Sequence, residues 1–442
     1  MSETSELQEL LTWLDRHIDY ERVAPTRRSI PTLTAMEEMA KLLGNPEQAY
    51  PIIHVTGTNG KGSTSTIATA LLVTMGLSVG TYTSPNLEKV SERIALGGLP
   101  IGDEPFRESL ERLQLLDGIL AEPPTRFELL TMAAFGAFAD AAVDVGVVEV
   151  GLGGSWDSTN VATGQVAVIT NVGLDHVEVL GGTVESIATD KSGIIKAGAT
   201  VVLGDVQPSV RAIVEQRASD VGAGPVLMIN RDFAVTRNDV AVGGRVIDLT
   251  TPYGTYEDLF LGLNGAHQAI NAAVAIVAVE AFFGRTLPDE VVEATLDRVK
   301  MPARLEVMGR SPLVVLDGAH NVDGATALAE AIREGFSVAG STTLVTGMLR
   351  GRDPVAMLQA FAGIGVDRVI ACAPDSPRAL EAQVVAEAAR SLGLHAEIAS
   401  SIEAACEQAI AAAGEDDLVV VAGSLYLAGA ARGTLKRLCS GA

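Results

Sequence analysis

The stretch His54-Val55-Thr56-Gly57-Thr58-Asn59-Gly60-Lys61-Gly62-Ser63-Thr64 decides the fold of this chain. Residues 50–55 form a short β-branched run, as a buried parallel strand would, and residues 64–75 have apolar side chains at helical spacing. A glycine-rich turn between a strand and a helix can hold a polyphosphate, because backbone N–H groups and the helix N-terminus face the anion. Lys61 adds a positive charge, and a serine hydroxyl at this place can ligate Mg²⁺. Gly62 separates Lys61 from Ser63, unlike the commonest phosphate loop, so an ordinary turn is the alternative interpretation.

The length and net charge of the chain exclude some classes of protein. A chain of 442 residues is too long for one core and predicts two or three domains. Its 32 basic and 55 acidic residues give a net charge of −23, which disfavours nucleic acid and anionic membranes as partners. We find neither a signal-like N-terminus nor an apolar run long enough to span a membrane, and Cys372, Cys406 and Cys439 lack metal-ligand spacing. The sequence therefore predicts a cytoplasmic protein with buried or incidental thiols.

Strand and helix patterns alternate over most of the chain. Residues 1–43 predict helices on either side of a loop around 25–31. Further strands are predicted at 77–82, 145–150, 166–171 and 200–203. This alternation indicates a doubly wound, mostly parallel sheet.

A change of pattern separates this region from the C-terminal part. Small strands around turns within 233–236, 239–247 and 259–261 predict an antiparallel patch, and 264–283 predicts an apolar helix. A second α/β series then begins near Met301, with strands predicted at 313–316, 342–346, 368–372, 395–398 and 418–422. We therefore expect a C-terminal Rossmann-like α/β domain, with domains at 1–298 and 299–442.

Oxygen and imidazole side chains follow the predicted strands of the first sheet. Ligands of open α/β sheets bind beyond the carboxyl ends of the strands. Ser84, Glu149 and His176 lie at such ends, and a hydroxyl, a carboxylate and an imidazole suit a hard divalent ion such as Mg²⁺. A structural ion pair for Glu149 and a helix cap for His176 are the alternatives.

Two further segments carry charged residues of interest. Residues 183–196 predict a helix with Thr183 as its N-cap, and composition alone predicts that Lys191 and Lys196 within it are solvated. In the C-terminal half, Asp317-Gly318-Ala319-His320-Asn321 follows a strand, as a loop that contacts ribose or phosphate does. Arg304 offers a planar cation for phosphate, with an interdomain salt bridge as the alternative.

Taken together, these motifs resemble the folylpolyglutamate synthase/dihydrofolate synthase family of the Mur ligase superfamily. The matching motifs occur in order: His-Val-Thr-Gly-Thr-Asn-Gly-Lys-Gly-Ser, Thr-Ser-Pro…Glu-Arg, Arg-Phe-Glu-Leu-Leu-Thr, Glu-Val-Gly-Leu-Gly-Gly…Asp-Ser-Thr-Asn, Leu-Asp-His, Lys-Ser-Gly-Ile-Ile-Lys, Gly-Ala-His-Gln-Ala-Ile-Asn-Ala-Ala, Ala-Arg-Leu-Glu, Leu-Asp-Gly-Ala-His-Asn and Gly-Ser-Leu-Tyr-Leu. Each motif alone is modest evidence, whereas ten in register are specific.

The resemblance implies an ATP-dependent ligase that adds L-glutamate to a carboxylate of a reduced folate, or to dihydropteroate, through an acyl phosphate. It implies a monomer, two Mg²⁺ ions and room for a monovalent cation. It also implies that 1–298 is an ATP-binding domain of the Mur-ligase central type and that 299–442 is a glutamate-ligase domain. Joining two anions needs cationic groups in a preorganised site, which agrees with the residues found.

The resemblance also implies the role of individual residues. The ATP-binding positions are Thr58, Asn59, Gly60, Lys61, Gly62, Ser63, Asn271, Arg304 and Asp317. The metal ligands are Ser84, Glu149, His176 and Lys191, the last as a carbamate, which replaces the surface expectation for this lysine. The folate-binding positions are Thr125, Arg126, Phe127, Glu128, Trp156, Asp157 and Ser158. The catalytic set is Lys61, Lys191, His176 and His320.

Some positions depart from the family pattern. Asn86 stands where histidine is common, Ser155-Trp156 where Arg-Leu is frequent, Ala303 where glycine is common, Val322 where proline is common, and Asp190 where glutamate is common. None removes a group that the chemistry needs. A related ligase for another carboxylate, such as a UDP-muramoyl peptide, is one alternative, and a nucleotide-binding regulatory module without ligase activity is another.

Overall fold

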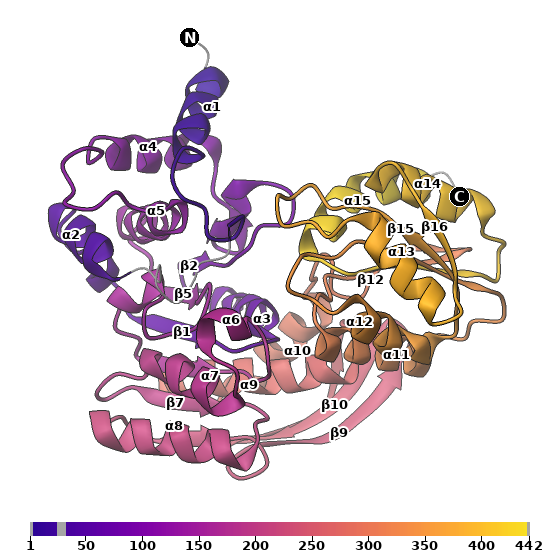
Figure 1. The fold of residues 1–442 in the computed structure, drawn as a ribbon. Coiled ribbons are helices and arrows are strands. Elements are labelled where there is room, and N and C mark those ends of the chain that lie inside the picture. The colour runs from indigo at the N-terminus through magenta and orange to yellow at the C-terminus, as the bar shows by residue number, and fades with distance from the viewer. Residues whose placement is uncertain (1–2, 24–31, 440–442) are drawn as a thin grey trace. The chain divides into compact units, whose positions relative to one another are not determined.

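The computed structural model describes residues 3–23 and 32–439, so the predicted loop at 25–31 lies outside the described residues. The chain packs into two compact units. The first unit comprises Met1–Asn238, Ile247–Phe260 and Gln268–Val299, and the second comprises Asp239–Val246, Leu261–His267 and Lys300–Ala442. Each unit is built around its own β-sheet (Figure 1).

The sheet of the first unit has eight strands within the described residues. Their order is β4 (Leu99–Pro100), β3 (Ile94–Leu96), β2 (Val79–Tyr82), β5 (Val145–Glu149), β1 (Ile52–Thr56), β6 (Val166–Ile169), β7 (Thr200–Leu203), β8 (Val226–Met228). Strands β2, β5, β1, β6, β7 and β8 run parallel, and β3 pairs antiparallel with β2. The chain leaves β1 toward β2 on one side and later adds β6 to β8 on the other. The end of β1 is therefore a topological switch point, where ligands of such sheets bind.

Helices cover both faces of this sheet. The α-helices of the described residues up to 298 are α1 (Glu3–Leu14), α2 (Thr34–Leu42), α3 (Lys61–Thr74), α4 (Asp103–Gln114), α5 (Arg126–Asp140), α6 (Val177–Leu180), α7 (Val184–Lys191), α8 (Pro208–Val221), α9 (Ala266–Phe283) and α10 (Asp289–Arg298). Successive strand residues point to opposite faces. In β2, a Cβ on Gly80 would lie 2.4 Å from the ring of Phe138 in α5, whereas the hydroxyl of Thr81 lies 2.7 Å from that of Thr69 in α3. Helices α5 and α3 thus lie on opposite faces, as a doubly wound sheet requires.

Helix α9 is the most apolar helix of the first unit. By length and composition it could cross a membrane, but 67% of it is buried within the protein. A core helix of a globular fold has the same composition, because it is surrounded by apolar side chains.

A separate three-stranded sheet forms where the small strands were predicted. Its order is β11 (Thr255–Leu261), β10 (Gly244–Thr250), β9 (Ala234–Ala241). The predicted antiparallel patch is confirmed, and one of the predicted turns lies within 239–247: Val242 is 96% exposed and Gly243 has φ +82°. Glycine adopts this left-handed conformation at low cost, so the chain reverses direction there.

The second unit contains a six-stranded sheet within the described residues. Its order is β12 (Glu306–Arg310), β13 (Leu313–Leu316), β17 (Leu418–Val421), β14 (Thr342–Thr346), β15 (Val366–Ala371), β16 (His395–Ile398). All pairs are parallel except β12 with β13, so the predicted Rossmann-like pattern is confirmed and an antiparallel edge strand is added. Its helices are α11 (Val322–Gly335), α12 (Pro354–Phe361), α13 (Ala382–Ser391), α14 (Ile402–Ala412) and α15 (Leu425–Cys439).

The predicted helix over 183–196 is shorter than expected. Thr183 is its N-cap, with its hydroxyl accepting from Ser186 N at 3.2 Å, as predicted. The α-helix ends at Lys191, however, and continues as a 3₁₀ turn over Ser192–Ile194. Gly193 lies against Ser155 there, with a Cβ position 2.1 Å from its Oγ, so this close approach to another loop ends the regular helix.

Candidate active site

The loop after β1 is held against the end of β6. Thr58 N donates to Asn171 O at 3.0 Å, and Asn59 N donates to Asn171 Oδ1 at 2.9 Å. Thr170 Oγ1 donates to Asn59 O at 2.6 Å, and a Cβ on Gly57 would lie 1.9 Å from that same hydroxyl. Only glycine fits at Gly57, so the loop has one well-defined course at the switch point of the sheet.

Other predicted ATP-binding residues pack directly against this loop. Gly60 has φ +82° and caps α3, and its Cβ position is 2.4 Å from Asn271 Oδ1 in α9. Asn271 is buried and donates to Gln268 Oε1 at 3.0 Å. Ser63 is buried in the first turn of α3. The structure therefore brings Gly60 and Asn271 together, although 211 residues separate them in the sequence.

Two lysines donate to one carbonyl of the loop. Lys61 Nζ donates to Gly57 O at 3.2 Å and to Thr58 O at 3.4 Å, and Lys191 Nζ donates to Gly57 O at 2.8 Å. Lys191 is only 4% exposed, so the expectation from composition that it is solvated was wrong. Burial, together with the charge of Lys61, lowers the pKa of Lys191 to about 7. A buried lysine with such a pKa has a reactive neutral form near neutral pH.

The predicted metal ligands Glu149 and His176 lie at or after the ends of neighbouring strands of the first sheet. Glu149 ends β5 and is 4% exposed; its Oε2 accepts from Ser84 N at 3.4 Å and lies 3.6 Å from a Cβ position on Gly62. His176 follows β6 and occupies the N-cap of α6 with φ +50°, but its side chain makes no cap hydrogen bond. That imidazole is one-third exposed. Within the described ranges, no three His, Cys, Asp or Glu side chains form a cluster that could hold a metal.

The first predicted folate-binding segment forms a helix cap. Thr125 is the N-cap of α5: its hydroxyl accepts from Glu128 N at 3.2 Å, and Glu128 Oε2 accepts from Thr125 N at 2.6 Å. Burial raises the pKa of Glu128. Arg126 Nε donates to Asp15 Oδ1 at 3.1 Å. The pattern Thr-x-x-Glu is the sequence signature of this reciprocal cap, so the cap could have been predicted from the sequence.

The second predicted folate segment is the loop 151–160, between β5 and β6. A Cβ on Gly151 would lie 2.4 Å from the ring of Phe127, which places that ring against the loop. The carboxylate of Asp157 accepts from Leu152 N at 2.9 Å and from Thr159 N at 3.0 Å, and burial raises its pKa. Ser158 is buried beside it, and Trp156 packs partly buried on the core. Asp157 thus organises the loop in addition to any contact with a ligand.

The predicted residues of the second unit meet at the end of β13. Asp317 accepts from Leu305 N and from Ala319 N, each at 2.7 Å. A Cβ on Gly318 would lie 2.4 Å from a guanidinium nitrogen of Arg304. Burial raises the pKa of Asp317, although the charge of Arg304 opposes this. His320 Nδ1 lies 3.0 Å from Gly318 O.

The turn before β12 carries backbone strain. Ala303 and Leu305 have φ values of +53° and +46°, a conformation that costs a non-glycine residue about 1–2 kcal/mol. Ala303 stands where the family pattern has glycine, and this φ value gives the physical reason for that pattern. Asp317 holds the turn through Leu305 N, so strain and predicted ATP-binding residues occur together.

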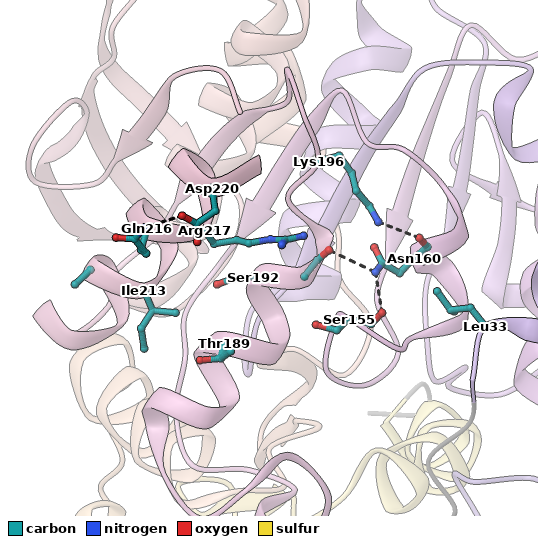
Figure 2. A pocket seen from close by; sticks show the side chains of 12 residues that line it. Leu33, Ser155, Asn160, Thr189, Ser192, Lys196, Ile213, Gln216, Arg217 and Asp220 are labelled. Atoms are coloured by element: carbon teal, nitrogen blue, oxygen red, sulfur yellow. Dashed lines mark hydrogen bonds between the residues drawn. The ribbon is translucent and has the colours of Figure 1, made fainter. Parts of the chain in front are cut away.

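A cavity of about 760 Å³ lies beside the loop 151–160 in the first unit (Figure 2). Lys196 Nζ donates to Asn160 O at 3.3 Å, and Asn160 Nδ2 donates to Ser155 O at 2.9 Å. Its lining residues are Leu33, Ser155, Asn160, Thr189, Ser192, Gly193, Lys196, Ala212, Ile213, Gln216, Arg217 and Asp220. None of the predicted ATP-binding, folate-binding or metal-binding residues lines this cavity. We therefore do not assign the cavity to any of these three sites.

Comparison with known proteins places this chain in a family. The Mur ligase middle domain matches residues 55–279, and the Mur ligase glutamate ligase domain matches residues 303–425. The dihydrofolate synthase/folylpolyglutamate synthase of Mycobacterium tuberculosis is 36% identical, with 92% of this chain and 91% of that protein covered.

Solved structures show the same similarity. Folylpolyglutamate synthase of M. tuberculosis complexed with ADP has a TM-score of 0.90 at 35% identity and covers 98% of this chain and 99% of its own. Escherichia coli FolC in complex with DHPP and ADP has a TM-score of 0.85 at 27% identity, with 97% and 98% covered. The chain belongs to the folylpolyglutamate synthase/dihydrofolate synthase family of the Mur ligases.

Proposed function

We propose that this protein is an ATP-dependent ligase that joins L-glutamate to a folate carboxylate, either of a reduced folate or of dihydropteroate. The observation that carries the proposal is the pair Lys61 and Lys191, which share Gly57 O in the glycine-rich loop after β1. Relatives named folylpolyglutamate synthase and dihydrofolate synthase support it, as do neighbours complexed with ADP and DHPP. These names favour the folate substrate over another carboxylate.

The chemistry follows from the anionic substrates. The folate carboxylate attacks the γ-phosphorus of ATP, the bond to ADP breaks, and an acyl phosphate forms. The glutamate amine then attacks the acyl carbon, loses a proton and displaces inorganic phosphate. We assign the backbone N–H groups of residues 60–63 and the ammonium of Lys61 to the phosphates of ATP, because they lie at the N-terminus of α3. In the second unit, Arg304 would hold phosphate or ribose oxygens and His320 would lie near them.

The hydroxyl of Ser84, the carboxylate of Glu149 and the imidazole of His176 have the donor chemistry that suits a hard divalent ion. Glu149 directs a carboxylate oxygen toward Gly62, and Ser84 contacts that same carboxylate through its backbone N–H. We assign Ser84, Glu149, His176 and a carbamate on Lys191 as Mg²⁺ ligands, with phosphate oxygens and water completing the set. Mg²⁺ bound here would offset the negative charge of the two substrates. The low pKa of Lys191 favours the neutral amine that reacts with CO₂.

In this proposal the two parts of the chain bind different sets of substrates. We assign residues 1–298 to ATP and the folate acceptor, and 299–442 to the remaining ATP contacts and glutamate. Phe127 would stack on the pterin, and the loop 151–160 would line its pocket, with Trp156 and Ser158 at that surface.

Product formation tests the proposal. Purified protein with ATP, Mg²⁺ and L-glutamate is given tetrahydrofolate or dihydropteroate, and phosphate release and product mass are followed. We expect phosphate and a product one glutamyl residue heavier, and we expect neither from Lys61→Met. Release with both acceptors would establish a bifunctional enzyme, and release with neither would exclude the folate ligase in favour of another substrate or a regulatory module.

A further inference from the structure

His54 is a polar residue in the middle of a buried apolar strand. Its neighbours Ile53 and Val55 in β1 are fully buried, and so is His54 itself. Strand β1 lies between β5 and β6, with His54 opposite Val148 and Ala167. Burial, and then the charge of Lys196, lowers the pKa of His54 to about 3, so its ring is neutral at physiological pH.

The ring of His54 starts a chain of hydrogen bonds that ends in the loop 151–160. His54 Nε2 lies 2.9 Å from Thr159 Oγ1, and Thr159 Oγ1 donates to Asp157 Oδ1 at 2.5 Å. A hydroxyl has one proton. Since that proton goes to the carboxylate, Thr159 must accept from His54, which fixes the Nε2–H tautomer. The other oxygen of Asp157 accepts from Leu152 N at 2.9 Å.

This tautomer leaves a buried acceptor without a partner. His54 Nδ1 finds no hydrogen-bond partner among the residues that the structure describes. Such an orphan lowers stability, and a leucine of similar volume would not have it. A contribution to the stability of β1 therefore does not explain why this position holds a histidine. The hydrogen bond from His54 to Thr159 does.

A second residue on the same face of β1 also holds the loop. His54 and Thr56 are two positions apart, so their side chains point to the same face. Thr56 Oγ1 donates to Gly153 O at 2.8 Å. Strand β1 thus fixes the loop 151–160 at two points, while its own carboxyl end continues into the glycine-rich phosphate loop.

We propose that His54 is a positioning residue: through Thr159 it orients Asp157 and so holds the loop 151–160 in register with the phosphate loop of the same strand. The inference rests on the proposed function, in which the folate acceptor lies on the loop 151–160 and ATP on the phosphate loop. In this proposal His54 touches neither substrate. It sets the alignment of the folate carboxylate with the γ-phosphate of ATP that this carboxylate attacks.

Removing either end of the chain tests this role. His54→Leu and Thr159→Val should each lower kcat/KM for the folate acceptor about tenfold, because misplaced reactants lose rate steeply. The KM for ATP should stay unchanged, and the free energy of unfolding of His54→Leu should equal or exceed that of the wild type. His54→Gln, which can present an N–H to Thr159, should restore part of the activity, as Thr159→Ser should for Thr159→Val.

The double variant decides whether the two residues act as one chain. We expect His54→Leu with Thr159→Val to be no worse than either single variant, since each breaks the same connection. Effects that multiply in the double variant would overturn the proposal, and so would a His54→Leu variant that is destabilised but keeps the wild-type kcat/KM for the acceptor. Tyr50→Phe is a matched control: it removes a buried hydrogen bond to Phe135 O at 3.1 Å next to β1 and should leave kcat/KM for the acceptor unchanged.

One readout is independent of turnover. In protein labelled with ¹⁵N at its six histidines, one ring should show a neutral Nε2–H signal at pH 6–8 that shifts in Thr159→Val. If the wild type shows no ligation, the dissociation constant of dihydropteroate is measured in place of the kinetic constants. Suppose that the wild type shows no ligation but shows this signal, and that His54→Leu binds dihydropteroate more weakly. These results would refute the proposed function and leave the positioning role standing. Absence of the signal would refute the positioning role.

Discussion

Single residues decide whether the phosphate loop can form, and Gly60 shows this most clearly. It combines φ +82° with a Cβ position 2.4 Å from Asn271 Oδ1. Gly60→Ala should therefore displace Asn271 and raise the KM for ATP at least tenfold, with a stability loss of about 1–2 kcal/mol from the left-handed backbone. ATP titration and urea unfolding measure both effects.

Gly76 provides the control for backbone strain without a clash. It has φ +89°, and nothing lies within 4 Å of its Cβ position. Gly76→Ala should lower stability by a similar amount and leave the KM for ATP as it is. Equal effects of both variants on ATP would mean that Asn271 does not define the loop.

Lys191 is the second residue on which the proposed chemistry depends. Its amine is buried, bonded to Gly57 O, and has a lowered pKa. Lys191→Ala should abolish ligation, and Lys191→Arg should do the same because a guanidinium does not form the carbamate. Wild-type protein prepared without CO₂ should regain activity with bicarbonate, followed by phosphate release. Near-normal turnover of Lys191→Ala would exclude the carbamate.

At the scale of elements, the N-terminus of α5 shows how a predicted ligand residue can serve the fold. Thr125 and Glu128 satisfy each other's backbone N–H groups. Thr125→Ala should lower the free energy of unfolding by about 1 kcal/mol, and Thr125→Ser should retain most of it. Urea unfolding checks this. A raised KM for the folate acceptor without a loss of stability would instead indicate direct substrate contact.

A buried carboxylate links α9 to β11. Glu280 is fully buried, and Tyr256 Oη donates to it at 2.8 Å. Burial raises the pKa of Glu280 from 4.5 to about 7. The folded state therefore binds its proton more tightly than the unfolded state does, so the stability from this group is present below pH 4.5 and is lost as the pH rises to about 7.

Glu280→Gln should remove this dependence. The wild type should lose up to about 3 kcal/mol between pH 4.5 and 7 through Glu280. The variant should lack that loss and be more stable than the wild type at pH 8. Urea unfolding at several pH values measures it, with the exposed Glu293→Gln of α10 as control. A wild-type pH profile unchanged in Glu280→Gln would contradict the assignment.

At the scale of the whole molecule, the net charge of −23 acts on stability. Like charges repel in the compact state, and salt screens this repulsion. Raising NaCl from low to physiological concentration should therefore increase the free energy of unfolding at pH 8. Near the isoelectric point of about 4.6, the same addition should have no such effect. Urea unfolding at both pH values distinguishes screening from a specific ion effect.

Much of this fold could be predicted because its local patterns are strong. The strands at 200–203, 313–316 and 342–346 have the observed bounds, since short runs rich in β-branched residues between turns favour buried parallel strands. The antiparallel patch was also predicted, but the exact ends of β9 and β10 were not, because alternating residues continue on both sides of the glycine turn between them. The domain boundary near 298–303, the cytoplasmic location and the monomeric state stay predictions.

The sequence by itself determined the glycine-rich loop, the alternation of strands and helices and the family, because each depends on residues close together in the chain or on ordered motifs. Only the tertiary structure decided that Lys191 is buried against Gly57, 134 residues away, and that His54 reaches Thr159 across 105 residues. These contacts arise from the order of strands in the sheet. Composition predicts a solvated lysine, and only the packing of α7 beside the phosphate loop removes it from water and lowers its pKa.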